Sequence, residues 1–396
     1  MNIMTFIFLC CFAVYFTITR NINAEEQIIL RQPPIEKNDS IISSQNITDN
    51  KPKIQIAILL DSSNSMDGLI EQTRTQIWSV INAVSKVTKN GETPLFEVSL
   101  YHYGNNGLPS TEGFNRMLTQ LTNDLDVVSE NLFSIQTNGG QEYAGWVINS
   151  AIKELEWSAN NEDFRAIFIA GNEPFDQGNI SWESAINLAS SKDIVINTIY
   201  CGDAENAESN LWARGADVGK GSYFNIDQNE RIVDIPTPYD GEIRQLNQEL
   251  NETYIPYGEQ GIVSFERQRQ QDVNAFSSPS PSAGLNRAIT KTTSNYNTGN
   301  WDLVEAIASN TVNLSDIDTN TLPENLRSLT TNQLRDIINE MIQKRELIKT
   351  EINELSEKRT QYITQNRPIL EDNTTLESLM IETLYNQLKA KGFSIN

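Results

Sequence analysis

The stretch IQIAILLDSSNSMDG, residues 54–68, decides the fold of this chain. A run that is apolar except for Gln55 leads directly into Asp61, and two serines follow at alternate positions, Ser63 and Ser65. Runs that are apolar on both faces are typical of strands in a parallel sheet covered by helices. A carboxylate followed by spaced hydroxyls indicates a polar site where this strand ends.

Three further segments repeat the apolar pattern: LFEVSLYHYG (95–104), RAIFIAG (165–171) and DIVINTIYCG (193–202). Amphipathic segments alternate with them, over residues 67–88, 142–157 and 181–191, and another helix follows an N-cap at Asn123 or Asp124. Residues 113–122 favour a short edge strand. This alternation predicts a doubly wound, mostly parallel α/β domain over residues 53–232.

The C-terminal part reads as helical. We expect a helix over residues 240–253, a loop or hinge over 277–284, and a long helix over 331–362. Seven-residue spacing in the long helix predicts a heptad seam, formed by Leu334, Met341, Ile348, Leu355 and Tyr362 with Ile338 and Ile352, and interrupted by Arg345 and Arg359. The arginines favour packing within the chain over an oligomer zipper. We therefore expect a helix plus connector over 233–325 and a helical hairpin or short coiled coil over 326–396.

The N-terminus begins with an apolar run from Ile3 to about Phe16, which is short for a membrane span. We interpret residues 1–24 as a secretory signal peptide and residues 25–52 as a flexible linker, so the protein is expected to be secreted or periplasmic. An uncleaved membrane anchor is the alternative. The mature chain keeps only Cys201, which excludes an internal disulfide and indicates a buried thiol.

The charge balance narrows the classes of partner. The 396 residues carry a formal net charge of -22, which argues against nucleic acid and anionic lipid surfaces. His102 is the only histidine, so a histidine-cluster zinc site is excluded and Ser-His-Asp catalysis is disfavoured.

The end of the first strand can hold a cation. In an extended turn, residues at positions i, i+2 and i+4 can point into one crevice, so Asp61, Ser63 and Ser65 would present one carboxylate and two hydroxyls to a single point. Such hard oxygen ligands suit Mg²⁺ or Mn²⁺. The next helix starts at Asp67, and its N-terminus favours an anion beside that cation.

The D-x-S-x-S pattern after an apolar strand and before a long helix resembles the metal ion-dependent adhesion site of von Willebrand factor type A (vWA) domains. The resemblance covers about residues 53–232, and TNGGQEYAGWVINSAI is similar to the second metal loop of that family. The AGNEPFDQG and GGQEY segments also resemble a subgroup of secreted bacterial vWA proteins with helical C-terminal extensions.

Two departures from the family pattern affect the predicted metal site. Gln141 and Glu142 follow the double glycine where a threonine is usual, and Gly171 stands where the family has an aspartate. Glu142, Asn172 and Glu173 are the candidates for replacement oxygens, with Asp176 as a further one. Ca²⁺ remains a possible ion, and a site that has lost its metal is the alternative.

The resemblance implies a binding function. In the family the metal is not usually catalytic and completes its shell with an acidic side chain from a partner protein. The first hypothesis is therefore a binding protein that holds such a partner through a divalent cation. The second is a metal-free vWA scaffold whose C-terminal helices carry the interaction, with self-association as one form of it. A hydrolase that uses a metal-bound water is the third.

Overall fold

The computed structural model of the protein describes residues 51–226, 234–366 and 376–395. The predicted signal peptide and nearly all of the predicted linker lie outside these described residues. Within the described ranges, no helix has the length and hydropathy that would allow it to cross a membrane.

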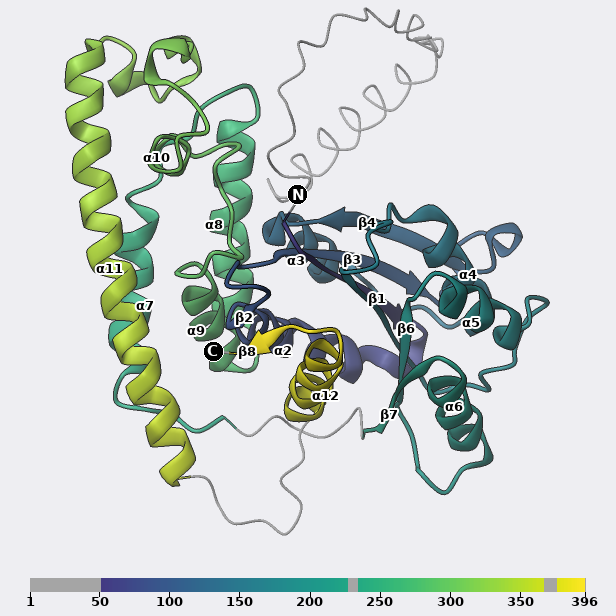
Figure 1. Ribbon diagram of the computed structural model, residues 1–396. Helices are drawn as coiled ribbons and strands as arrows, with labels where there is room; N and C mark the ends of the chain where they lie inside the picture. The colour runs from purple at the N-terminus through teal and green to yellow at the C-terminus, as the bar shows by residue number, and fades with distance from the viewer. Residues whose placement is uncertain (1–50, 227–233, 367–375, 396) are drawn as a thin grey trace, which may run out of the picture. The chain divides into compact units, whose positions relative to one another are not determined.

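The centre of the fold is a six-stranded sheet in the order β4-β3-β1-β5-β6-β7. Its strands are β1 (Lys53–Asp61), β3 (Leu95–Tyr103), β4 (Asn115–Thr122), β5 (Phe164–Gly171), β6 (Val195–Tyr200) and β7 (Lys220–Asn225). All run parallel except β4, which pairs antiparallel with β3 at the edge. The predicted doubly wound, mostly parallel fold is confirmed, and β1 lies inside the sheet as expected (Figure 1).

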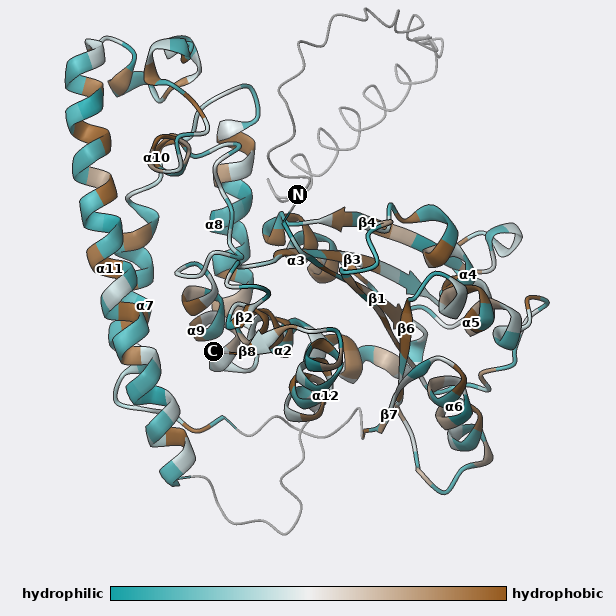
Figure 2. Ribbon diagram, viewed as in Figure 1, coloured by the Kyte–Doolittle hydropathy of each residue, from teal (hydrophilic) through white to brown (hydrophobic). Residues whose placement is uncertain are grey.

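Helices cover both faces of this sheet. On one face lie α2 (Asp67–Val84) and α3 (Leu125–Ser134), and on the other lie α4 (Ala144–Glu154), α5 (Trp182–Ser191) and α6 (Ala207–Val218). Side chains of β1 alternate between the two layers, with Ile54 and Ile56 in the first core cluster and Ala57 and Leu59 in the second. This double burial explains the continuous apolar runs, which colour the central strands as hydrophobic in Figure 2.

Local sequence signals set the helix starts. Asp124 accepts hydrogen bonds from the backbone N–H groups of Asp126 and Val127, as the predicted N-cap of α3 should. Ser181 does the same for α5 through the N–H of Ser184. Cys201, directly after β6, is a buried free thiol, which confirms that prediction.

The helical region contains more helices than expected. Residues predicted as one helix plus a connector form α7 (Asp240–Asn251), α8 (Gly261–Ser277), α9 (Pro281–Thr290) and α10 (Leu303–Ala308). The loop predicted over 277–284 is therefore limited to the three residues between α8 and α9. This region shares a core with the α/β domain, because Ile243 and Leu285 belong to the same buried cluster as Trp78 of α2.

Buried charges also connect the helical region to the α/β domain. Arg287 of α9 is fully buried and lies 2.7 Å from Asp126 of α3 and 2.7 Å from Asp272 of α8. Lys291, which is equally buried, lies 2.9 Å from Asp272. Removing one member of such a network would leave a buried charge without a partner, which costs several kcal/mol.

The long helix α11 (Thr331–Asn366) packs against α7, α9 and α10 of its own chain. Of the predicted heptad positions, Leu334, Ile338, Ile348, Ile352 and Leu355 are buried, whereas Met341 and Tyr362 are half-buried. Arg345 lies 2.6 Å from Asp302, and Arg359 lies 3.1 Å from Asp240. The two arginines that interrupt the seam are therefore ion-pair partners inside the chain.

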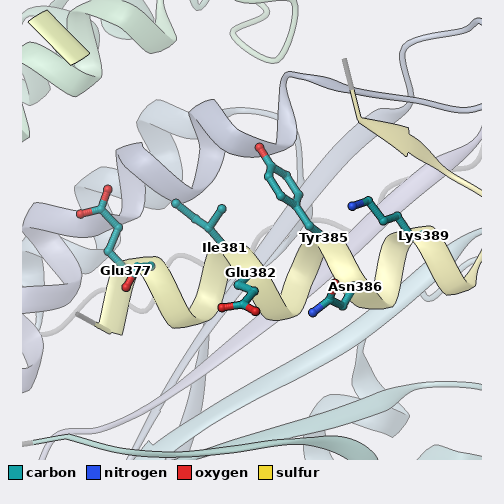
Figure 3. A pocket seen from close by; sticks show the side chains of 7 residues that line it. Glu377, Ile381, Glu382, Tyr385, Asn386 and Lys389 are labelled. Carbon is teal, nitrogen blue, oxygen red and sulfur yellow. The ribbon is translucent and has the colours of Figure 1, made fainter. Parts of the chain in front are cut away.

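The last helix, α12 (Leu376–Ala390), differs from the expected hairpin. It packs on α2 and β7, whereas α11 packs on α7, α9 and α10. Leu384 and Leu388 are completely buried, and the hydroxyl of Tyr385 donates to the Ala83 carbonyl of α2. Figure 3 shows an open hollow lined by α12, with Tyr385 on its wall. Beyond α12, β8 (Ser394–Ile395) pairs with β2 (Val87–Thr88). The heptad pattern could not reveal this, because it describes α11 alone.

Candidate metal site

The predicted site forms where β1 ends. Asp61 is completely buried, and its Oδ1 accepts a 2.8 Å hydrogen bond from the backbone N–H of Ser63. The hydroxyl oxygens of Ser63 and Ser65 lie 3.2 Å apart. The turn places these three side chains together, as the alternate spacing predicts, before α2 begins at Asp67.

Two other loops reach the same point. The backbone N–H of Asn138 donates to the Ser62 carbonyl over 3.0 Å, which holds the loop that carries Glu142 against the end of β1. The Asn172 amide, directly after β5, donates to the Ser65 hydroxyl over 3.1 Å. The structure therefore brings Glu142 and Asn172 to Asp61, Ser63 and Ser65.

The other two candidates lie further out. Glu173 is exposed and accepts a 3.2 Å hydrogen bond from the Gln177 amide. Its charge contributes to the raised pKa values of Asp61 and Glu142, so it belongs to the rim of the site. Asp176 is exposed as well.

The carboxyl groups of Asp61 and Glu142 contact each other, and this contact requires either a shared proton or a bound cation. Burial raises the pKa of both carboxyls above their ordinary range, and the neighbouring Asp61 raises the pKa of Glu142 further. Two carboxylates are both acceptors, so they can share a hydrogen bond only if one of them holds a proton. A bound cation satisfies the same pair with both groups ionised.

Unpartnered oxygens gather at this place. Among the described residues, the buried side-chain oxygens without a hydrogen-bond donor include Asp61 Oδ2, Glu142 Oε2 and Asn172 Oδ1. Buried acceptors without donors are rare in proteins, and an ion is one explanation for them. The donor set of carboxylate, amide and hydroxyl oxygens fits a hard divalent cation. The described residues hold no group of three or more His, Cys, Asp or Glu side chains suited to a metal, so the hydroxyl and amide oxygens are essential to this set.

Glycines make room for the carboxyl groups. A Cβ on Gly104 would lie 2.6 Å from Asp61 Oδ1 and 2.7 Å from Glu142 Cγ, and this glycine has a φ of +72°. A Cβ on Gly140 would lie 2.3 Å from the Gly104 carbonyl oxygen. Gly104 is not among the predicted site residues, although the HYGNNG segment at the end of the second predicted strand signals a turn there.

The absence of the family's aspartate at position 171 has a steric cause. A Cβ on Gly171 would lie 2.5 Å from the Tyr103 hydroxyl oxygen and 3.1 Å from the Trp212 ring. Tyr103 is fully buried, and its hydroxyl donates to the Ala170 carbonyl over 3.0 Å. Tyr103 and Trp212 therefore occupy the space that an aspartate side chain would need.

Aromatic side chains brace the loops around the site. The rings of Tyr143 and Trp146 are stacked with centroids 6.4 Å apart. Trp146 lies against Gly113, where a Cβ would come within 2.2 Å of the indole, and Tyr143 lies against Gly178, where a Cβ would come within 2.7 Å of the ring. The two-ring stack thus fills the space between the glycines of two site loops. Trp146 is half-buried.

These features define an α/β domain with an oxygen-rich site at the carboxyl edge of a parallel sheet. Residues 55–237 match the von Willebrand factor type A domain family. The chain is a vWA-domain protein with a helical C-terminal region, as the D-x-S-x-S pattern predicts. Domains of this family are generally non-catalytic modules of protein–protein interaction, and they can bind a divalent metal. No protein of curated function matches the sequence.

Several solved structures are similar to this chain. The conserved hypothetical protein BatB from Bacteroides thetaiotaomicron is 18% identical over 44% of this chain and 90% of its own, with a TM-score of 0.34. The SpRpn10 VWA domain is 17% identical over 45% of this chain and 89% of its own, with a TM-score of 0.33. Proximal thread matrix protein 1 from the mussel byssus, solved with a zinc-occupied MIDAS motif, is 12% identical over 46% of this chain and 43% of its own, with a TM-score of 0.35.

Proposed function

We propose that this protein binds a protein partner through a divalent cation held at the end of β1. The observation that carries the proposal is the set of unpartnered oxygens on Asp61, Glu142 and Asn172. Together with the hydroxyls of Ser63 and Ser65, they would hold Mg²⁺ or Mn²⁺, with Ca²⁺ as the third candidate. The bound cation supplies positive charge that attracts an acidic side chain of the partner.

The protein residues prepare this site in three ways. Asp61 and Glu142 supply the negative charge that keeps a cation, and the glycines at 104 and 140 allow their carboxyl groups to meet. The stack of Tyr143 on Trp146 holds the surrounding loops. We propose a binding role without catalysis. We further propose that the signal peptide directs the protein to the periplasm or to secretion, where the partner would be met.

Calorimetric titration of residues 25–396 with Mg²⁺, Mn²⁺ and Ca²⁺ tests the metal site. We expect one cation per chain in the wild type and none in Asp61→Ala. Glu156→Gln is the matched control, because it removes an exposed carboxylate at the opposite edge of the sheet and should leave the affinity unchanged. If the wild type takes up none of the three ions while its circular dichroism shows a folded protein, the metal site is excluded.

A metal-free scaffold is the second candidate function, and one surface supports it. Helix α8 exposes Ile262, Val263 and Val273, each more than half accessible to solvent. If this face carries the interaction, Ile262→Lys with Val273→Glu would abolish partner capture, and EDTA would not affect it. The full chain should be used for this test, because residues 240–396 share their core with the α/β domain.

A further inference from the structure

The loops around the site carry charge of one sign. Five connections described by the structure lie at this edge of the sheet, over residues 62–66, 104–114, 135–143, 172–181 and 201–206. They contain no lysine or arginine and six acidic residues: Glu112, Glu142, Glu173, Asp176, Asp203 and Glu205. Asp61 and Asp67 flank the first connection. We call these acidic residues the acidic rim. Arg116, the first basic residue after the 104–114 connection, lies on β4, and its charge lowers the pKa of His102.

The opposite edge of the same sheet provides an internal comparison. Its connections, over residues 51–52, 85–94, 123–124, 155–163, 192–194 and 219, also contain six acidic residues. They carry four lysines as well, Lys51, Lys86, Lys89 and Lys192. The acidic rim is therefore not a mere consequence of an acidic chain, because among the connections that the structure describes, basic residues are missing from those at one edge only.

A separate observation points to a ligand at this edge. Asp61 is completely buried, and its Oδ2 has no hydrogen-bond donor among the described residues. Its carboxyl group lies beside Gly104 and Glu142, which belong to two of the five connections. An unsatisfied acceptor thus lies at the floor of the face that the acidic rim surrounds.

We propose that the partner's docking surface carries one acidic side chain surrounded by lysine and arginine residues. This inference rests on the proposed function and specifies the partner. The cation can attract a single carboxylate, but other acidic groups on the partner would face the acidic rim within a Debye length, about 8 Å at physiological salt. Basic residues around the bridging carboxylate remove that repulsion and speed association by electrostatic complementarity.

Random-peptide display in the presence of Mg²⁺, with elution by EDTA, tests the inference. We expect the eluted peptides to contain one Asp or Glu and to be enriched in Lys and Arg at neighbouring positions. On the variant Glu112→Gln/Glu173→Gln/Asp176→Asn, the acidic residue should remain while the basic enrichment falls to the input level. Glu92→Gln/Glu156→Gln/Glu351→Gln is the control, since it changes the net charge equally at exposed positions elsewhere.

A selected peptide then provides a quantitative test by fluorescence anisotropy. Each neutralised rim charge should weaken binding about two- to fivefold, as expected for exposed ion pairs, and added NaCl should reduce the difference between the variants. EDTA-eluted acidic peptides without basic enrichment would overturn this inference and leave cation bridging intact. If no acidic peptide elutes with EDTA, the proposed function fails, and this inference fails with it.

Discussion

The carboxyl groups of Asp61 and Glu142 meet in a buried site although they come from different loops. Asp61 ends a central strand, and Glu142 lies just before α4. Two carboxyl groups in contact away from water repel each other once both ionise, so the apo site is destabilised where a cation would stabilise it. The same two residues therefore favour cation binding and lower the stability of the cation-free protein.

This opposition predicts two effects of Asp61→Asn. Asparagine keeps an oxygen to accept from the Ser63 N–H but removes the charge. In EDTA at pH 8 the variant should be more stable than wild type by on the order of 1 kcal/mol, the free energy of about one pKa unit. Saturating Mg²⁺ should stabilise the wild type by about 2.7 kcal/mol at one hundred times Kd, and the variant hardly at all. Urea unfolding with and without Mg²⁺ measures both, and an equal Mg²⁺ response in the two proteins would contradict the site.

Restoring the family's aspartate should harm this protein. In Gly171→Asp the new side chain must displace the Tyr103 hydroxyl and the Trp212 ring, so we expect a loss of about 2–4 kcal/mol, typical of an overpacked core with a buried charge. Tyr103→Phe removes the hydroxyl oxygen that lies nearest to the new Cβ. The double variant should therefore recover part of the loss in urea unfolding. If Gly171→Asp is as stable as wild type, Tyr103 does not explain the departure from the family pattern.

The sequence reveals the scaffold better than the details of the site. The apolar run into Asp61 predicts a central strand because double burial leaves a direct trace in the residues. The alternate spacing of Ser63 and Ser65 likewise predicts that their side chains meet, because residues two apart in an extended segment point to the same side. Tertiary contacts leave no such trace. Neither the contact between Glu142 and Asp61 nor the conflict at Gly171 could be derived, since both depend on how separate loops approach. In the same way, the heptad in α11 shows the seam but not the aspartates, Asp302 and Asp240, that pair with its arginines.

The single histidine gives a prediction about pH. Burial, followed by the charge of Arg116, lowers the pKa of His102 to about 4. Its Nε2 is buried and has no hydrogen-bond partner among the described residues, so the charged form would be poorly accommodated. Since the unfolded pKa is near 6.5, the unfolded chain binds more protons between pH 6.5 and 4. This group therefore makes the protein less stable as pH falls through that window, and the effect levels off below about pH 4.

NMR titration of the one imidazole measures this pKa directly. In urea unfolding, His102→Gln should lose less stability than wild type between pH 6.5 and 4, and the difference between the two proteins isolates His102 from the carboxyl groups. An imidazole pKa near 6.5 in the folded protein would contradict the prediction.

The ion pair of Arg345 in the interrupted seam of α11 gives a prediction about the stability of the helical region. Arg345 lies 2.6 Å from Asp302 and donates to the Thr253 carbonyl over 2.9 Å. Asp302 is completely buried and also caps α10. Arg345→Met would leave that carboxylate without its cation, so we expect a loss of about 3–5 kcal/mol. Lys344→Met is the control, because its ion pair with Glu252 is exposed and should contribute less than about 1 kcal/mol.

Arg345→Met combined with Asp302→Asn separates the ion pair from simple packing. The double variant removes both charges, so it should be more stable than Arg345→Met alone, because no buried carboxylate is left unpaired. Asparagine also keeps an oxygen that can accept from the N–H of Val304 at the start of α10. If the double variant loses as much free energy of unfolding as Arg345→Met and Asp302→Asn lose together, the arginine acts only through its volume. The heptad would then accept any long side chain at this position.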